Sequence, residues 1–200
     1  MPIMIEEKDY TMAAAKLAVS VAHVKAVTTV ESSGAGFIEL GGIVTPKILF
    51  ERHVMYSQVS TKFGRSKADA MAASYPDVCN PVSGGYGTIA AQPGRMQKAA
   101  ELIDRECALC SASWGLFQIM GYHWKRLGYD NLQHFVNLMY AGEAYHLDAF
   151  VRFILADSNL LAALRAKNWA AFAKGYNGSA YAKNSYDTKL AAAYKAAGGI

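Results

Sequence analysis

The segment VAHVKAVTTVESSG, residues 21–34, decides the fold because it joins a helical repeat to a helix stop. Apolar side chains recur at spacings of three and four and lead to a carboxylate, in the series Leu17, Val21, Val24, Val27 and Glu31. This spacing marks one face of a helix over 19–31, which closely follows another helix over 7–17. Ser32-Ser33-Gly34 predicts where the helix ends, since glycine supplies the left-handed turn that terminates helices.

The rest of the chain is predicted to be mostly helical, with one short β region. Glycines that alternate with large apolar residues around Pro46 predict a β-hairpin or irregular sheet over 35–50. Within 62–94, a long surface loop is expected, of the kind that often carries function. Helices are expected near 51–60 and 66–73, over Gln97–Cys107, over most of 131–156, and over 158–166, 168–175 and 185–197. The chain is therefore predicted to be mainly α and to form a single domain over 1–200.

Composition and charge narrow the class of protein. Apolar residues make up 52% of the chain and charged residues 18%, so a sizeable core can form and a disordered chain is excluded. The net charge is 20 − 16 = +4, which favours an anionic polymer or envelope surface. The basic residues form no run, so no nucleic-acid partner is expected.

Neither a membrane span nor a signal peptide is expected. The longest apolar stretches are interrupted by charges, at Lys16, Lys25, Glu143, Asp148 and Arg152. Acidic residues stand where a signal peptide needs positive charge, at Glu6, Glu7 and Asp9. We therefore expect a protein made in the host cytoplasm, which something else must release if its target lies beyond the membrane.

The cysteines and histidines predict no metal site and no cofactor. Three cysteines do not make a disulfide framework, and the C-x-x-C pair of Cys107 and Cys110 lacks a second pair of ligands. Buried free thiols, including Cys79, are the favoured interpretation, and a redox role is the alternative. No ligand grouping is present among His23, His53, His123, His134 and His146.

Glu31 is the residue that most indicates chemistry. It lies seven residues after Val24 and four after Val27, so its carboxyl group faces the protein. Burial and the negative end of the helix dipole both raise a carboxyl pKa. A proton retained near neutral pH is what a general acid needs for glycosidic cleavage. Taken alone, however, Glu31 is better explained as a surface glutamate at a frayed helix end.

Two later segments carry groups suited to a sugar chain. Within residues 111–120, Ser113 and Gly115 precede Gln118, whose amide both donates and accepts hydrogen bonds. The simpler interpretation is a tight turn that leads into a buried helix. Tyr176 and Asn177 offer a flat aromatic face and a second amide. Here the simpler interpretation is an Asn-Gly turn.

Together these segments resemble lysozyme-like muramidases and lytic transglycosylases, in which Glu-Ser, Ser-x-Gly-Leu-x-Gln and Tyr-Asn motifs follow one another. The same order is found in Glu31-Ser32, Ser113-Trp114-Gly115-Leu116-Phe117-Gln118 and Tyr176-Asn177. The chain resembles more closely still the N-acetylmuramidase domain of phage endolysins active on Gram-negative cell walls. That likeness is carried by residues 30–37, 49–53, 113–121 and 176–178, and it spans about residues 8–195.

The resemblance implies a lysozyme-like α+β fold with a helical-bundle lobe. Such endolysins often carry an extra wall-binding domain, for which 200 residues leave no room, so the catalytic domain alone is expected. It implies cleavage of the β-1,4 bond between N-acetylmuramic acid and N-acetylglucosamine in peptidoglycan, with Glu31 as the general acid. The residues that would bind the glycan strand are Ser113, Gly115, Gln118, Tyr176 and Asn177.

The second carboxylate is less sharply indicated. Glu51 is preferred because it lies in the family-like Phe50-Glu51-Arg52-His53 segment, and the other candidates are Glu39, Asp104 and Glu106. A structural ion pair with Arg52 or another base is the competing interpretation of Glu51. A separation of roughly 6.5–9.5 Å between Glu31 and Glu51 would suit an inverting mechanism.

Two other functions stay open: a lytic transglycosylase that acts on the same bond, and an inactive glycan-binding or phage structural module. The basic C-terminal stretch, Lys183–Ala197, could contact an anionic envelope weakly, but a packed closing helix is the preferred interpretation. We expect a monomer that acts on peptidoglycan in the periplasm.

Overall fold

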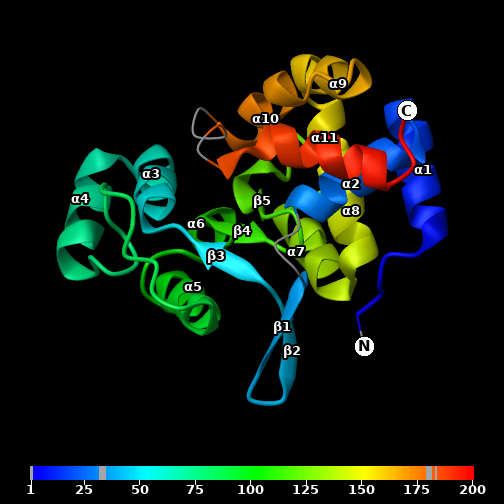
Figure 1. Cartoon of the computed structure of the whole chain (residues 1–200). Helices are drawn as coiled ribbons and strands as arrows, with labels where there is room; N and C mark the ends of the chain where they lie inside the picture. The colour runs from blue at the N-terminus through cyan, green and yellow to red at the C-terminus, as the bar shows by residue number, and fades with distance from the viewer. Residues whose placement is uncertain (1, 32–34, 179–181, 183) are drawn as a thin grey trace. The chain divides into compact units, whose positions relative to one another are not determined.

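The computed structural model describes residues 2–31, 35–178, 182 and 184–200, and Figure 1 shows its helices and strands in chain order. They are α1 (Glu7–Leu17), α2 (Val21–Glu31), β1 (Phe37–Leu40), β2 (Ile43–Pro46), β3 (Ile48–Phe50), α3 (Arg52–Phe63), α4 (Arg65–Ser74), η1 (Ile89–Ala91), α5 (Gln92–Leu102), α6 (Arg105–Cys110), β4 (Ala112–Trp114), β5 (Ile119–Met120), η2 (Gly121–His123), α7 (Leu132–Ala141), α8 (Glu143–Leu155), α9 (Ser158–Arg165), α10 (Trp169–Asn177) and α11 (Tyr186–Ala196). The chain divides into two compact units, one of residues 1–36 with 141–200 and one of residues 37–140.

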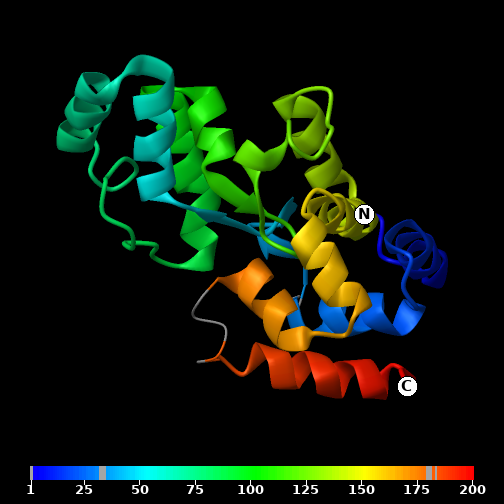
Figure 2. The ribbon, with the colours of Figure 1, turned by 90° about the horizontal axis from the view of Figure 1, so that it is seen from above.

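The first unit is helical, and its centre is the contact between α2 and α11. The two helices lie side by side in Figures 1 and 2. Ala22 and Ala26 of α2 are buried against Tyr194 of α11, and Trp169 at the start of α10 packs on the same cluster. Small alanines let the helices approach closely, so α2 is buried on several sides and its C-terminal Glu31 is held in place.

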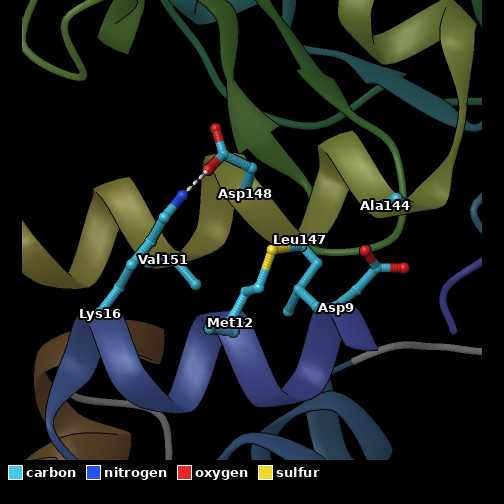
Figure 3. A pocket seen from close by; sticks show the side chains of 8 residues that line it. Asp9, Met12, Lys16, Ala144, Leu147, Asp148 and Val151 are labelled. Carbon is cyan, nitrogen blue, oxygen red and sulfur yellow. Dashed lines mark hydrogen bonds and ion pairs between the residues drawn. The ribbon is translucent and has the colours of Figure 1, made fainter. Parts of the chain in front are cut away.

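Helix α1 packs on α8 along a narrow crevice (Figure 3). Met12 and Leu147 line this crevice, and Lys16 bridges it with an ion pair of 2.8 Å to Asp148. Burial opposes the ionisation of Asp148, but hydrogen bonds from Lys16 and Arg152 outweigh it and lower the pKa of this carboxyl. The Lys16–Asp148 ion pair therefore joins the two helices across the crevice.

The second unit contains both small sheets. Strands β1 and β2 form an antiparallel hairpin in which Phe37 pairs with Pro46 and Leu40 with Ile43. Strands β3, β4 and β5 form an antiparallel sheet in that order. Trp114 of β4 is 1% exposed, and its indole N–H donates to the carbonyl of Leu109, which fixes the sheet over the core.

The predicted mainly α fold with a small β region is confirmed, but one expected helix is wrong, and the structure adds detail in two other places. The helix expected over Gln97–Cys107 is two helices, because the Asp104 side chain caps α6 by accepting the Cys107 N–H at 2.8 Å. The helical stretch over 131–156 breaks at Gly142, beside which Ile3 bonds to the chain. Directly after the turn near residue 115 the chain forms strand β5, rather than the buried helix of the simpler interpretation. The expected helix stop at Ser32-Ser33-Gly34 lies outside the described residues.

All three cysteines are free and buried, as predicted. Burial raises the pKa of the Cys107 thiol to about 12 and that of the Cys79 and Cys110 thiols to about 11. Within the described residues, no single helix is long and apolar enough to cross a membrane. Only α1 and α2 taken together reach that length and composition, and the chain bends by 109° between them.

Candidate active site

The carboxyl group of Glu31 lies at the last position of α2 and is partly buried. Its Oε1 accepts a hydrogen bond of 2.8 Å from the side-chain amide of Asn177, the last residue of α10. Burial raises the pKa of Glu31, and the Asn177 hydrogen bond opposes that rise without cancelling it. Because Oε1 is occupied by an N–H donor, Oε2 is the oxygen left to carry a proton.

The chain is fixed again shortly after Glu31, at Gly36. The Gly36 N–H donates to Oε1 of Glu143, a buried residue in the first turn of α8, at 2.6 Å. A Cβ at position 36 would lie 2.7 Å from Nδ1 of His146 and 3.0 Å from Glu143 Oε1, so any larger residue there would displace the His146 side chain. The segment that carries the acid is therefore anchored on α10 through Asn177 and on α8 through Glu143.

Tyr176 is half-buried beside this site and packs against three phenylalanines. Its ring stacks on Phe172 at 6.0 Å with an interplanar angle of 4°, and it meets Phe150 and Phe153 edge-on at 5.6 Å each. Burial, and then the nearby Glu31 carboxylate, raise the pKa of the Tyr176 phenol well above its ordinary value. The predicted sugar-stacking face is thus largely in contact with phenylalanines.

In the second unit, Ser113, Gly115 and Gln118 come together around the β4–β5 turn. Ser113 Oγ donates to Gln118 Oε1 at 2.9 Å, and Gln118 Nε2 donates to the Gly115 carbonyl at 2.7 Å. The Gly115 N–H in turn donates to the carbonyl of Lys47 at 2.8 Å. The turn requires positive φ values at two residues, 68° at Gly115 and 50° at Gln118. Glycine adopts such a φ without strain. The three predicted residues therefore build one tight turn against the start of β3.

Glu51 follows β3 directly and precedes α3. Its backbone N–H donates to the Ser111 carbonyl at 2.9 Å, which ties it to the sheet. Its Oε2 lies 3.2 Å from Nδ1 of His53, and its carboxylate also accepts a hydrogen bond from Tyr86. A base thus lies within ion-pair distance of Glu51, and it is His53, which pairs as an ion only when its ring is protonated.

Residues 75–88 form a loop, here called the strap, that is fastened beside Glu51. The Asn80 N–H donates to the Arg52 carbonyl at 3.1 Å, and a Cβ at Gly85 would lie 2.9 Å from the Arg52 guanidinium carbon. Arg95 donates to the carbonyls of Tyr86 at 3.1 Å and Asp77 at 2.8 Å. The long loop expected within 62–94 is thus held closely by two arginines.

Gln92 joins the strap to β3. This side chain is 1% exposed; its Oε1 accepts the Phe50 N–H at 3.1 Å, and its Nε2 donates to the carbonyls of Tyr86 and Thr88. Each hydrogen-bonding atom of the buried amide is therefore satisfied, so the position of Phe50, and with it Glu51, depends on Gln92.

The structure thus brings Glu31 together with Asn177 and Tyr176, and separately gathers Ser113, Gly115 and Gln118, with Glu51 at the end of the neighbouring strand. Sequence reasoning missed Glu143, Gln92 and Arg95. Only Glu143 carried a local signal, since an acid directly after Gly142 suits the first turn of a helix. Among the described residues, no three His, Cys, Asp or Glu side chains group as metal ligands.

A carboxyl group kept partly from water at the end of a buried helix, in a largely helical chain with small antiparallel sheets, places the protein among lysozyme-type glycoside hydrolases. The sequence matches the N-acetylmuramidase family over residues 20–198, so the chain belongs to that family and is a peptidoglycan hydrolase. It is similar to a Burkholderia AP3 phage endolysin crystal structure, with 47% identity and a TM-score of 0.91 over 99% of this chain and 73% of that one. No curated protein matches the sequence. The family resemblance read from the motifs is confirmed.

Proposed function

We propose that the protein hydrolyses the β-1,4 bond between N-acetylmuramic acid and N-acetylglucosamine, as a phage endolysin, with Glu31 as the general acid. The observation that carries this proposal is the partly buried Glu31 carboxyl with its raised pKa and its hydrogen bond from Asn177. The proton on Glu31 Oε2 would be transferred to the glycosidic oxygen as the bond breaks and positive charge develops at the sugar ring, leaving Glu31 as a carboxylate. Asn177 would keep Oε1 in place throughout.

Glu51 is the proposed second carboxylate, which would act as the base that activates water. Support comes from its fixed backbone and from His53 and Tyr86, which orient its carboxylate. Ser113, Gly115 and Gln118 are proposed to bind the glycan strand by shaping the β4–β5 turn. Tyr176 and Asn177 are proposed to contact the sugar beside the acid.

In the decisive experiment, purified peptidoglycan is digested with the protein and the masses of the products are measured by mass spectrometry. Fragments with reducing N-acetylmuramic acid ends are expected. Fragments with anhydro ends only, lighter by one water, would instead identify a lytic transglycosylase. Fragments with reducing N-acetylglucosamine ends would overturn the bond assignment.

Paired variants test the two carboxylates. Glu31→Gln should lose clearing of outer-membrane-stripped Gram-negative cells by about a thousandfold or more, while the exposed Glu101→Gln should clear them normally. Equal clearing by Glu31→Gln and the parent would remove Glu31 from its role. A parent that binds the wall but does not cleave it would favour the inactive glycan-binding module. The Glu51→Gln variant tests whether Glu51 is a base that supports inversion or only a partner of His53. The anomeric proton of the products, followed by NMR, reports the stereochemistry of cleavage.

The proposed place of action is the periplasm, after synthesis in the host cytoplasm and release through a membrane opened by a partner. The protein is proposed to act there as a monomer, with at most a weak contact to the anionic envelope. Lys189 and Lys195 of α11 are the described cations of the C-terminal stretch, and Lys183 lies outside the described residues.

A further inference from the structure

A groove of about 350 Å³ opens on the second unit, close to Glu51 along the chain. One wall is the first half of α3, which contributes His53, Val54, Ser57 and Gln58, and the other is Tyr122 of η2. Its size lies in the range of small-molecule sites, roughly 300–1,000 Å³. The strap, the β4–β5 turn and the Glu31 site supply no side chain to it, and His53 is the groove residue that belongs to one of the motifs.

The topology places this groove at one edge of the three-stranded sheet. Both β3 and β5 run antiparallel to β4, so β3 and β5 run parallel to each other and end at the same edge. Glu51 and α3 leave from the end of β3, and η2 leaves from the end of β5. His53 belongs to the groove and also lies 3.2 Å from Glu51 Oε2. A ligand that contacts His53 is therefore one side chain away from the proposed base.

Apart from His53, the lining of the groove is polar and carries no ionised side chain. A hydroxyl, an amide, an imidazole and a phenol surround the isopropyl group of Val54, and no lysine, arginine, aspartate or glutamate is present. An acidic stem peptide would call for a cation to pair with its carboxylates. A sugar ring with hydroxyl groups and an acetamido arm calls for donors, acceptors and an aromatic face.

Tyr122 supplies the aromatic face. The residue is 41% exposed, and its ring centroid lies 4.3 Å from that of His123. His123 itself is partly buried; burial and Arg126 lower its pKa to about 4, so it packs as a neutral ring at physiological pH. The exposed phenol ring is thus held on one side by a neutral neighbour and is open on the groove side.

We propose that this groove is a subsite for one N-acetylated hexosamine of the glycan strand, with Tyr122 against the sugar ring and Gln58 and Ser57 bonded to its acetamido and hydroxyl groups. This rests on the proposed function, because the ligand is a residue of the same strand. His53 would link occupancy of the subsite to the orientation of Glu51.

The test measures binding of tetra-N-acetylchitotetraose, a peptide-free oligomer, by isothermal titration calorimetry to the full chain carrying Glu31→Gln, which prevents turnover. In that background, Tyr122→Ala and Gln58→Ala should each weaken binding by about tenfold, the loss expected when an aromatic or amide contact is removed. Tyr122→Phe, which keeps the ring, should bind within about threefold of the Glu31→Gln parent. Gln97→Ala, at an exposed glutamine on α5 whose side-chain amide donates to Glu101 in the same helix, is the matched control and should bind unchanged.

Several results would overturn the subsite. They are no binding of the oligomer by the Glu31→Gln parent, equal binding by Tyr122→Ala and that parent, or binding of peptide-bearing fragments alone. If Tyr122→Ala does not fold, as judged by its melting curve, Ser57→Ala at an exposed position of α3 and Gln58→Ala at a half-buried one decide the question. Cleavage by Glu31→Gln decides the proposed function separately, since the binding measurement does not depend on which residue is the acid.

Discussion

Asn177 donates its side-chain amide to Glu31 over 2.8 Å, although 146 positions of sequence separate the two residues. The contact joins the C-terminal ends of α2 and α10, two helices of the same compact unit. Glu31 is proposed to hold a proton, whereas the hydrogen bond from Asn177 stabilises its charged form. The pKa of Glu31 is therefore set by burial, which raises it, and by Asn177, which lowers it, so a single substitution can shift it.

Replacing Asn177 with alanine should extend activity to higher pH, by moving the alkaline limb of the pH–activity profile upward. The hydrogen bond lowers the pKa of Glu31 against the effect of burial, so its loss lets the pKa rise further. The maximum rate should fall, since Oε1 is no longer positioned. The measurement is kcat/KM on soluble peptidoglycan fragments between pH 4 and 9. Asn137→Ala, an exposed asparagine on α7, should leave the limb in place; a shift toward lower pH in Asn177→Ala would contradict the balance described.

Glu31→Gln should make the protein more stable while abolishing activity. The folded-state pKa of Glu31 is raised, so the native stability that this carboxyl contributes is complete below its ordinary value of 4.5 and is lost as pH rises through the folded-state pKa. Glutamine does not ionise and avoids that loss. Thermal melts should therefore show a higher melting temperature for Glu31→Gln at pH 8 and no difference near pH 4. A lower melting temperature at pH 8 would show that the ionised carboxylate is stabilised in the fold.

Gly36→Ala should destabilise the protein by about 1–3 kcal/mol, the usual cost of an overpacked buried site. The added methyl group would meet His146 and Glu143 and disturb the hydrogen bond to the Gly36 N–H. Urea unfolding gives the free energy directly. Gly94→Ala is the control: nothing lies within 4 Å of its added carbon, and alanine favours the helix there. Equal stability of Gly36→Ala and the parent would mean that α8 can retreat from the acid segment without cost.

Gln92→Ala should loosen the strap over residues 75–88. Truncation leaves the buried Phe50 N–H without its acceptor and removes two bonds to the strap, at about 1–3 kcal/mol for each buried group left unsatisfied. Hydrogen exchange followed by mass spectrometry should show faster exchange in peptides from 75–88 and at Phe50. The control Gln97→Ala should exchange at the same rate as the parent. If Gln92→Ala also exchanged at the parent's rate, Arg95 rather than Gln92 would be the residue that anchors the strap.

Deleting residues 186–200 should unfold the first unit. Leu190 of α11 is fully buried and Tyr194 is 8% exposed, and both would leave their neighbours on α2 and α10 open to water. Circular dichroism and the melting curve report this loss. The double variant Lys189→Ala, Lys195→Ala keeps the apolar face and should stay folded. A truncated chain that remained folded and lost only whole-cell activity would point to envelope contact instead.

The helices were predictable wherever apolar residues recur every three or four positions, because that spacing places them on one face of a helix. Val24 and Val27 made α2 visible, and the same spacing placed Glu31 toward the interior, where it lies. The break at Asp104 was not found, since an aspartate becomes a cap only when the backbone around it turns. Strands β4 and β5 were missed for a related reason. They span three and two residues, too few for an alternation to show, and they exist because β3 is there to pair with them.

The site was only partly predictable from the sequence. Single motifs named Glu31 and Asn177, and their contact became apparent from the fold. Gln92, Arg95 and Glu143 bond mainly to backbone atoms of distant segments, and no pattern in the sequence shows which carbonyl or N–H a side chain will reach. Gln118 shows the opposite case: its amide was expected to meet a sugar, and much of its bonding capacity is used inside its own turn.

The buried thiols of Cys79, Cys107 and Cys110 have a consequence for an enzyme proposed to leave a reducing compartment for an oxidising one. Thiol–disulfide exchange proceeds through the thiolate, and with pKa values of about 11 to 12 these sulfurs stay protonated on either side of the membrane. The same covalent chain is therefore expected before and after crossing, so the fold needs neither an oxidant to complete it nor a reductant to preserve it.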